Sequence, residues 1–247
     1  MILNSAKKET SELDGILAGL SKNFELQFEN MNVDGHEFEI LNITNMAAHL
    51  DKLLAAKKID NPLHDLPLWA KIWPSAMVLG RFLRKMEPRG KSLLELGAGM
   101  GVCSLLASAY GFSRIVLSDA NSEALQFARA NTLKNGLQDR IQVTQLEIGS
   151  GSKALQNETF DLIAASELLY LDELHRPILK FIDKHLAPGG KALFCTDIAR
   201  LKPAFKKLAS RDFTIQEGHI GLKSSENSEN GPEEQRRIYN ILILEKK

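Results

Sequence analysis

A glycine-rich turn, Gly97-Ala98-Gly99-Met100-Gly101, is the first place in the sequence where a ligand could bind. It follows the apolar run SLLELG, and a helix-like segment comes directly after it. Glycines let the backbone turn sharply and approach a ligand closely, and the amides that begin the helix are free to bind a polar group. Such turns also occur for packing reasons alone. The neighbouring residues therefore decide how the loop is interpreted.

Two carboxylates near this loop indicate which ligand fits it. Glu95 stands two residues before the first glycine, where its charge would repel a pyrophosphate and favour a cationic ligand. Asp119 ends the next apolar run, about 20 residues after the glycines, where an acid can bind the hydroxyls of a ribose. Val102 replaces the third glycine of the dinucleotide fingerprint, and no Gly-Lys-Ser/Thr follows to make a P-loop. A ligand with an adenosine end and a positive centre is S-adenosylmethionine.

A second group of polar residues follows the apolar run FDLIAAS. The stretch ASELLYLDE places Glu167 and Tyr170 directly after that run. In open parallel sheets ligands bind at the carboxyl ends of the strands, so both side chains are expected at the edge that holds the cofactor. A purely structural interpretation stays open: Tyr170 packs against the next helix, and Glu167 is an acid near the N-terminus of that helix, where negative charge is favourable.

The elements expected around these residues alternate between strand and helix. Strands are predicted at 92–97, 114–119, 140–147, 160–166 and 191–197, and helix-like segments separate them. This alternation predicts a parallel sheet with helices on both faces. Two further strand-like runs, 213–220 and 236–246, are joined without a helix and must pair antiparallel if they are neighbours. The expected fold is α/β, a Rossmann-like doubly wound seven-stranded sheet with one antiparallel strand.

The first part of the chain is predicted to form an appendage to this sheet. Residues 24–44 alternate between apolar and polar around Asp34-Gly35, a strong hairpin signal, and a helix-like segment follows. We expect an N-terminal β-hairpin and helix within residues 1–65 and the main domain at residues 66–247. The stretch 221–235 is rich in Ser, Asn and Glu, and we expect it to be a mobile loop.

Composition narrows the possible partners. Lys plus Arg and Asp plus Glu number 31 each, and no basic run is long enough to follow a phosphate backbone, so no nucleic-acid partner is expected. The chain starts without the apolar core of a signal peptide, and no apolar run approaches the roughly 20 residues that span a bilayer. We therefore expect no membrane association and a cytoplasmic location. Scattered histidines and two distant cysteines in apolar segments predict no metal site.

Several of these motifs resemble those of one known family. The segment ELGAGMG followed by SDA looks like motif I and the second-strand acid of class I, seven-strand S-adenosylmethionine-dependent methyltransferases. The stretch LPLWAKIWPSAMVLGRFL resembles the Trp-containing segment that precedes the glycine loop in the protein-lysine methyltransferase subgroup. The stretch ELLY looks like the Asp/Glu-x-x-Tyr/Phe motif of that subgroup and lacks both prolines of the Asn/Asp-Pro-Pro-Tyr motif of amide methyltransferases. The resemblance runs from about Leu66 to Asp197.

The resemblance implies roles at the cofactor for residues spread over four strand ends. These residues are Trp73, Glu95, Gly97, Ala98, Gly99, Gly101, Asp119, Ala120, Glu147, Ile148 and Ser166. The loop residues would shape the methionine side, Trp73 would cover it, Asp119 would bind the ribose, and Glu147-Ile148 would meet the adenine, where the family often has Asp-Trp. Two alternatives remain: Trp73 is a core aromatic, and Glu147 is a solvent-facing strand end.

The resemblance also implies the reaction, an N-methyl transfer from S-adenosylmethionine to a lysine in a protein. Glu167 would capture and orient the incoming ammonium, and Tyr170 would wall the channel and contact the alkyl chain of the acceptor. Two other functions stay open. One is methylation of a small nitrogen-containing metabolite, and the other is a cofactor-binding module without turnover.

Overall fold

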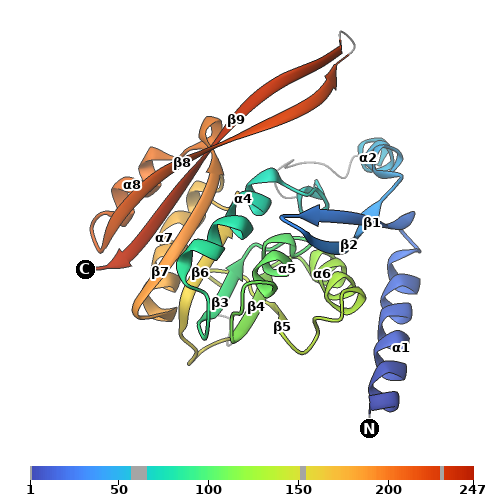
Figure 1. The fold of residues 1–247 in the computed structure, drawn as a ribbon. Helices are drawn as coiled ribbons and strands as arrows, with labels where there is room; N and C mark the ends of the chain where they lie inside the picture. The colour runs from blue at the N-terminus through green and yellow to red at the C-terminus, as the bar shows by residue number, and fades with distance from the viewer. Residues whose placement is uncertain (1, 57–65, 151–153, 229–230) are drawn as a thin grey trace.

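The computed structural model describes residues 2–56, 66–150, 154–228 and 231–247, which form an α/β fold around a seven-stranded sheet (Figure 1). The strands are β3 (Ser92–Leu96), β4 (Arg114–Asp119), β5 (Ile141–Gln145), β6 (Phe160–Ser166), β7 (Leu186–Asp197), β8 (Phe213–Ser228) and β9 (Gly231–Lys246). Their order is β5-β4-β3-β6-β7-β9-β8. Within the described residues, β9 runs antiparallel to β7 and to β8, and the other neighbouring pairs are parallel. The predicted sheet with one reversed strand is confirmed.

The order of the strands creates a switch point between β3 and β6. From β3 the chain runs outward through β4 to β5 and then returns to β6 on the other side of β3. Crevices at the carboxyl ends of such strands are where open α/β sheets bind ligands. The glycine loop follows β3, and Glu167 follows β6. The topology therefore brings the two polar regions of the sequence to the same end of the sheet, at the switch point.

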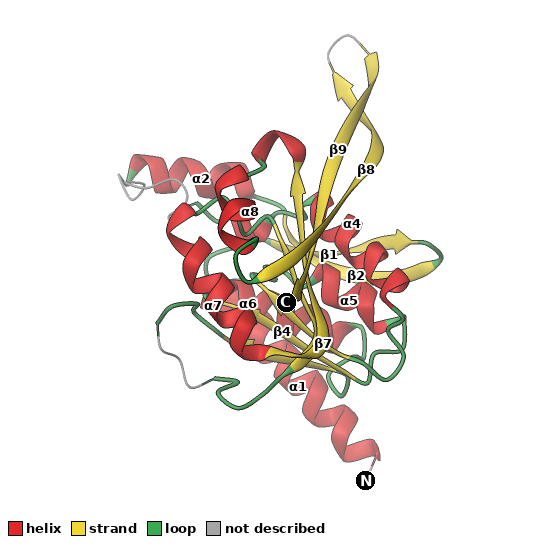
Figure 2. Ribbon diagram, turned by 90° about the vertical axis from the view of Figure 1, so that its left-hand side faces the viewer, coloured by secondary structure: helices red, strands yellow, loops and turns green. Residues whose placement is uncertain are grey.

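Helices cover both faces of the sheet (Figure 2). One face carries α4 (Pro74–Leu83), α5 (Val102–Ser108) and α6 (Ser122–Lys134), and the other carries α7 (His175–His185) and α8 (Pro203–Ala209). Side chains of β3 alternate between these two cores, since Leu93 packs with the first and Leu94 and Leu96 with the second. Short 3-10 turns are η1 (Leu68–Ala70), η2 (Arg84–Met86), η3 (Asp172–Leu174) and η4 (Ile198–Arg200). No helix in the described part of the chain is long and apolar enough to cross a bilayer.

The N-terminal region contains the predicted hairpin and helix together with a helix that the sequence did not reveal. The unexpected helix is α1 (Ile2–Leu20), and it precedes β1 (Leu26–Val33), β2 (His36–Ile43) and α2 (Met46–Ala55). Asp34 and Gly35 both have positive φ, 53° and 83°, as the tight two-residue turn between antiparallel strands requires. The hairpin prediction is confirmed.

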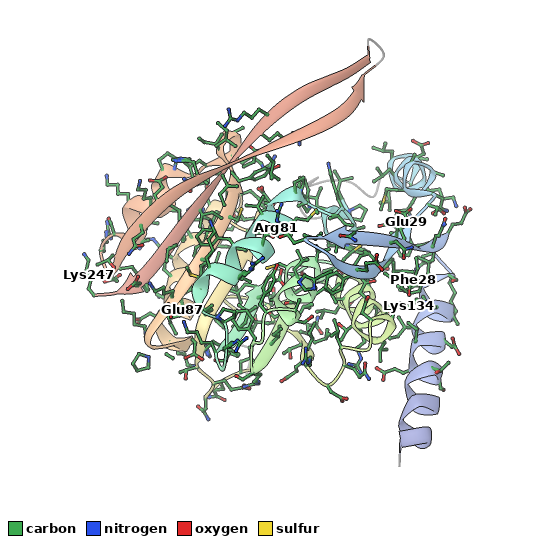
Figure 3. The ribbon with its side chains drawn as sticks, viewed as in Figure 1. Phe28, Glu29, Arg81, Glu87, Lys134 and Lys247 are labelled. Carbon is green, nitrogen blue, oxygen red and sulfur yellow. The ribbon has the colours of Figure 1, made fainter. Side chains whose placement is uncertain are left out.

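The hairpin packs on the same face of the sheet as α6. Phe24, Ile40 and Leu41 belong to the apolar core that also contains the α4, α5 and α6 side chains. The ammonium of Lys134 lies 5.0 Å from the centre of the Phe28 ring, and both residues are labelled in Figure 3. The predicted domain boundary after residue 65 lies at the end of segment 57–65, which is outside the described residues, so it stays a prediction.

The predicted loop at 221–235 is instead a continuation of β8 and β9. The two strands pair from Phe213↔Lys246 to Ser228↔Gly231, and the outer part projects from the sheet as a two-stranded ribbon (Figure 1). The loop prediction is therefore wrong for the described residues. Main-chain hydrogen bonds continue the ladder without needing an apolar face, so the polar composition concealed the strands. The Asn-Gly pair at 230–231 is a hairpin signal that could have revealed them.

Candidate functional site

The glycine loop takes a tight path that only glycine allows at its critical positions. Gly97, Gly99 and Gly101 have φ of 63°, 53° and 83°. A Cβ atom on Gly101 would lie 2.5 Å from Leu117 Cδ1, and one on Gly99 would lie 3.0 Å from the main-chain oxygen of Trp69. The loop is therefore confined from below by the sheet core and from above by η1.

Asp119, at the end of β4, is tied to the glycine loop. Its Oδ2 accepts a hydrogen bond from Gly99 N (2.8 Å), and its Oδ1 accepts one from Asn121 N (2.9 Å). Ala98 N donates to the carbonyl of the residue before Asp119 (3.0 Å). Burial raises the pKa of Asp119, and the main-chain donors oppose that shift. Since a carboxylate offers about four acceptor positions, Asp119 keeps capacity for the two hydroxyls of a ribose; Ala120 beside it is exposed.

Glu95 lies beneath the loop with only 1% of its surface exposed. Its Oε2 accepts hydrogen bonds from Ser104 N (2.9 Å) and Ser104 Oγ (2.5 Å), which ties β3 to the first turn of α5. Its Oε1 has no hydrogen-bond partner among the described residues, and the Cys103 thiol, a weak donor, lies near the carboxyl group. Burial raises the pKa of Glu95 to about 7, against the lowering effect of the Ser104 bonds. A nearby cationic ligand would favour its ionised form.

Glu167 follows β6 and is held in an unusual backbone conformation. Its φ is +49°, which costs of order 1 to 3 kcal/mol for a residue with a side chain. Glu167 N donates to Cys195 O (2.9 Å), and the carboxylate accepts hydrogen bonds from Asp197 N (3.0 Å) and from Arg200. These contacts aim the carboxylate at the carboxyl end of β7.

The two residues after Glu167 join this segment to the rest of the site. Leu168 lies directly over the glycine loop, because a Cβ atom on Gly97 would be 2.8 Å from Leu168 Cδ1. Leu169 is buried, and its carbonyl accepts a hydrogen bond from Nε2 of the buried His175 (2.8 Å). The structure therefore brings the glycine loop and the segment after β6 into contact through Leu168. The hydrogen bond from His175 to Leu169 holds that segment against α7. Neither Leu168 nor His175 was predicted from the sequence to belong to the site.

Tyr170 and Ser166 flank the same segment. Both are partly buried, and Ser166 is the last residue of β6, in register with Cys195 of β7. Burial raises the pKa of the Tyr170 hydroxyl, and the negative charge of Asp119 adds to the shift. Tyr170 therefore lies within the electrostatic reach of the predicted ribose acid.

Two tryptophans of the segment before α4 occupy different parts of the site. Trp69 covers the glycine loop with its backbone, and its ring packs 5.1 Å from that of Phe127. Trp73 is turned to the other side: its Nε1 donates to Leu68 O (2.9 Å), and the Arg200 guanidinium lies 5.4 Å from its ring centre. Trp73, which was predicted to cover the cofactor, therefore lies beside Arg200, the partner of Glu167. Trp69 is the tryptophan that contacts the glycine loop. The motif LPLW contains Trp69 and could have indicated it.

Glu147 and Ile148 lie beyond the end of β5, which stops at Gln145. Glu147 is exposed, and Ile148 packs partly buried against the core on the α7 side. The exposure of Glu147 agrees with the solvent-facing alternative, and the adenine contact of this pair stays a prediction.

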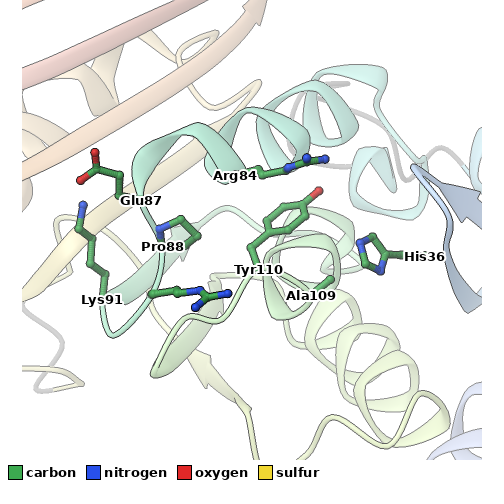
Figure 4. Close-up of a pocket in the computed structure, with 8 residues that line it drawn as sticks. His36, Arg84, Glu87, Pro88, Lys91, Ala109 and Tyr110 are labelled. Atoms are coloured by element: carbon green, nitrogen blue, oxygen red, sulfur yellow. The ribbon is translucent and has the colours of Figure 1, made fainter.

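A separate hollow of about 660 Å³ lies at the opposite ends of the strands (Figure 4). His36, Arg84, Lys91 and Tyr110 are among its lining residues, and Lys91 directly precedes β3. It therefore opens at the amino ends of the strands, away from the glycine loop and from Glu167.

The site as a whole fits S-adenosylmethionine. A loop with three glycines lies at a helix start, Asp119 has spare acceptor positions beside it, and the buried Glu95 has an oxygen without a hydrogen-bond partner beneath it. These features suit a ribose and a cationic centre and offer no lysine or arginine pair for a pyrophosphate within the described part of the loop.

Comparison with known proteins agrees with this arrangement. A sequence model of the family described as lysine methyltransferase matches residues 58–209. Protein N-lysine methyltransferase METTL21A of Danio rerio is 30% identical over 157 residues, which is 61% of this chain and 71% of that protein. A calmodulin-lysine N-methyltransferase of Arabidopsis thaliana is 30% identical over 126 residues, 49% of this chain and 41% of that protein. The family match contains every predicted site residue and excludes the hairpin, β8 and β9.

Solved structures share the fold. The S-adenosylmethionine-dependent methyltransferase from Agrobacterium tumefaciens superposes with a TM-score of 0.60 at 15% identity, over 90% of this chain and 71% of that one. At this level of identity the likeness shows the fold alone, and it supports the Rossmann-like sheet described above.

Proposed function

Because the chain belongs to the lysine methyltransferase family, we propose that it transfers the methyl group of S-adenosylmethionine to the side-chain amine of a lysine in a protein. The observation that carries this proposal is the position of Glu167. Glu167 follows β6 at the switch point, next in the chain to Leu168, whose side chain covers the glycine loop, and its carboxylate already binds the cation of Arg200. The predicted cytoplasmic location is part of the same proposal.

We assign the cofactor to the crevice between the glycine loop and the end of β6. When bound there, S-adenosylmethionine supplies an electrophilic methyl group on a positively charged sulfur. Asp119 would hold the ribose hydroxyls, and the loop from Gly97 to Gly101 would accommodate the methionine end. Glu95 would favour the positive charge from beneath, and Glu147-Ile148 would border the adenine.

The acceptor amine requires positioning and the loss of a proton. Methyl transfer is an in-line displacement, so the protein acts chiefly by aligning the amine and excluding water. Deprotonating a lysine from a pKa near 10.4 at pH 7 costs about 4 to 5 kcal/mol. Glu167 favours the charged form, so its role is to capture and orient the ammonium; proximity to a positive sulfur then favours release of the proton to solvent. Tyr170 would line the path of the alkyl chain.

Labelled S-adenosylmethionine and a cell lysate test the proposal. A labelled protein band that is acid-stable and contains methyllysine supports it. A labelled small molecule instead would support the metabolite alternative, and no label despite tight cofactor binding would support the non-catalytic one. Glu167→Gln is expected to lower methyl transfer at unchanged cofactor binding, whereas the control Glu87→Gln, an exposed acid at the hollow by the amino ends of the strands, is expected to leave it unchanged.

A further inference from the structure

Arg200 occupies the carboxylate that the proposed function assigns to the substrate amine. Its Nε donates to Glu167 Oε2 (2.9 Å), and its Nη2 donates to Glu167 Oε1 (2.8 Å). This bidentate pairing uses both oxygens of the side chain. In the structure as described, an incoming ammonium and the Arg200 guanidinium would compete for one position.

The surroundings of the guanidinium are those of a general cation site. Asp197 Oδ2 lies 3.8 Å from Arg200 Nη2, and the Trp73 ring centre lies 5.4 Å from the guanidinium carbon. A second cation, Lys71 Nζ, lies 4.9 Å from the same ring centre. Two carboxylates and an electron-rich aromatic face attract any cation, whether guanidinium or ammonium. The same groups can therefore receive a lysine side chain.

The two partners of this ion pair differ in how firmly they are held. The Glu167 side chain is 9% exposed and is fixed by Asp197 N, while the Arg200 side chain is 42% exposed and projects from the short turn η4. A change of rotamer can move the exposed guanidinium into water, where it stays solvated. The carboxylate and its main-chain bond would remain in place. The cation site can therefore stay formed after Arg200 leaves it.

We propose that Arg200 is an exchangeable internal cation that closes the acceptor site until a substrate ammonium displaces it from Glu167. This inference rests on the proposed function, because it gives Glu167 the acceptor amine as a ligand. Displacement makes Arg200 a specificity-determining residue. A free amine must compete with it unaided, whereas a lysine in a protein brings further contacts that favour the exchange. Arg200 contacts the binding group and takes no part in methyl transfer.

Amine binding to the full-length protein tests the exchange without any methyl transfer. The probe is n-butylammonium, titrated while the indole N–H signal of Trp73 is followed by NMR, with n-butanol as the uncharged control. That signal is assigned with Trp73→Phe. Removing the competing cation in Arg200→Gln should tighten n-butylammonium binding about fivefold, the factor that corresponds to an ion pair of about 1 kcal/mol. Arg200→Lys, which keeps the charge without the bidentate fork, should tighten it less.

Two further variants complete the experiment. Arg211→Gln, which removes an exposed arginine in the turn after α8, should leave binding unchanged. Glu167→Gln combined with Arg200→Gln should abolish the gain. Equal or weaker n-butylammonium binding by a folded Arg200→Gln protein would overturn the inference, since Arg200 would then be a fixed support of Glu167. A lysate that yields no methyllysine would instead overturn the proposed function, and the two failures are distinguishable because only the second involves transfer.

Discussion

Replacing Glu95 by glutamine tests the buried carboxylate beneath the glycine loop. Burial raises the pKa of Glu95 from its ordinary value of 4.5 to about 7. The folded protein therefore binds this proton more tightly than the unfolded chain does. The resulting stability is fully present below the unfolded pKa and is lost as the pH rises to the folded one. At about 1.4 kcal/mol per pH unit, this rise of the pKa is worth about 3.5 kcal/mol in total, of which about 2.5 kcal/mol of unfolding free energy is lost between about pH 5 and pH 8.

Urea unfolding of the wild type and of Glu95→Gln across this pH range measures the effect. Glutamine keeps the size of the side chain and an acceptor for Ser104 while removing the ionisable group. Subtracting the two unfolding free energies at each pH cancels the contributions of other titrating groups. The wild type should lose about 2.5 kcal/mol relative to the variant between about pH 5 and pH 8. A difference that stays constant with pH would refute the argument that burial controls this carboxylate.

Three further variants test other parts of the site. Asp119→Asn should weaken S-adenosylmethionine binding about 10- to 100-fold in calorimetry, because a charged acceptor is worth about 1.5 to 3 kcal/mol per hydrogen bond; unchanged affinity would contradict the ribose role. Gly101→Ala should lower the free energy of unfolding by about 1 to 3 kcal/mol more than Gly136→Ala, since both have positive φ and only Gly101 also meets Leu117; equal losses would show that the contact relaxes freely. The Asn131 side chain accepts a hydrogen bond from Leu41 N and donates one to Met100 O. Asn131→Leu should lower the free energy of unfolding by about 1 to 3 kcal/mol for each of these two buried main-chain groups, measured by thermal unfolding, and a smaller loss would mean that water replaces the side chain.

Local sequence patterns predicted the sheet and the ligand loop because the causes are local. The central strands β3, β4 and β6 are largely apolar runs, as strands buried on both faces require. The glycines at positive φ, such as Gly97 and Gly101, and the pair Asp34-Gly35 occur where the backbone has a conformation that other residues avoid. Such features are visible in a few consecutive residues, so no tertiary information was needed.

Contacts between distant segments were not predictable in this way. Arg200 binds Glu167 across 33 positions, and neither residue type at its position signals the other. The different positions of Trp69, against the glycine loop, and Trp73, beside Arg200, depend on the path of the chain from η1 to α4, which composition does not encode. The outer parts of β8 and β9, within residues 221–235, were missed for another reason: their sequence is polar and has no alternation of apolar and polar residues to detect. The site residues could thus be predicted from motifs, whereas the residues that contact them could be identified only in the folded structure.

Asn131 shows why the N-terminal hairpin matters to the glycine loop. This fully buried asparagine accepts a hydrogen bond from Leu41 N of β2 (2.7 Å) and donates one to Met100 O of the loop (3.0 Å). One turn later, Asn135 exchanges two hydrogen bonds with the Glu39 main chain, at 2.9 and 2.8 Å. Asparagine is unfavourable inside a helix, so Asn131 within α6 is explained by its bonds rather than by helix propensity, whereas Asn135 is the C-cap of that helix. The Asn131 side chain forms hydrogen bonds with both the hairpin and the glycine loop. Displacing β2 would therefore leave the buried Asn131 Oδ1, next to the glycine loop, without its donor. The hairpin is therefore a structural support of the glycine loop, although it lies outside the family match.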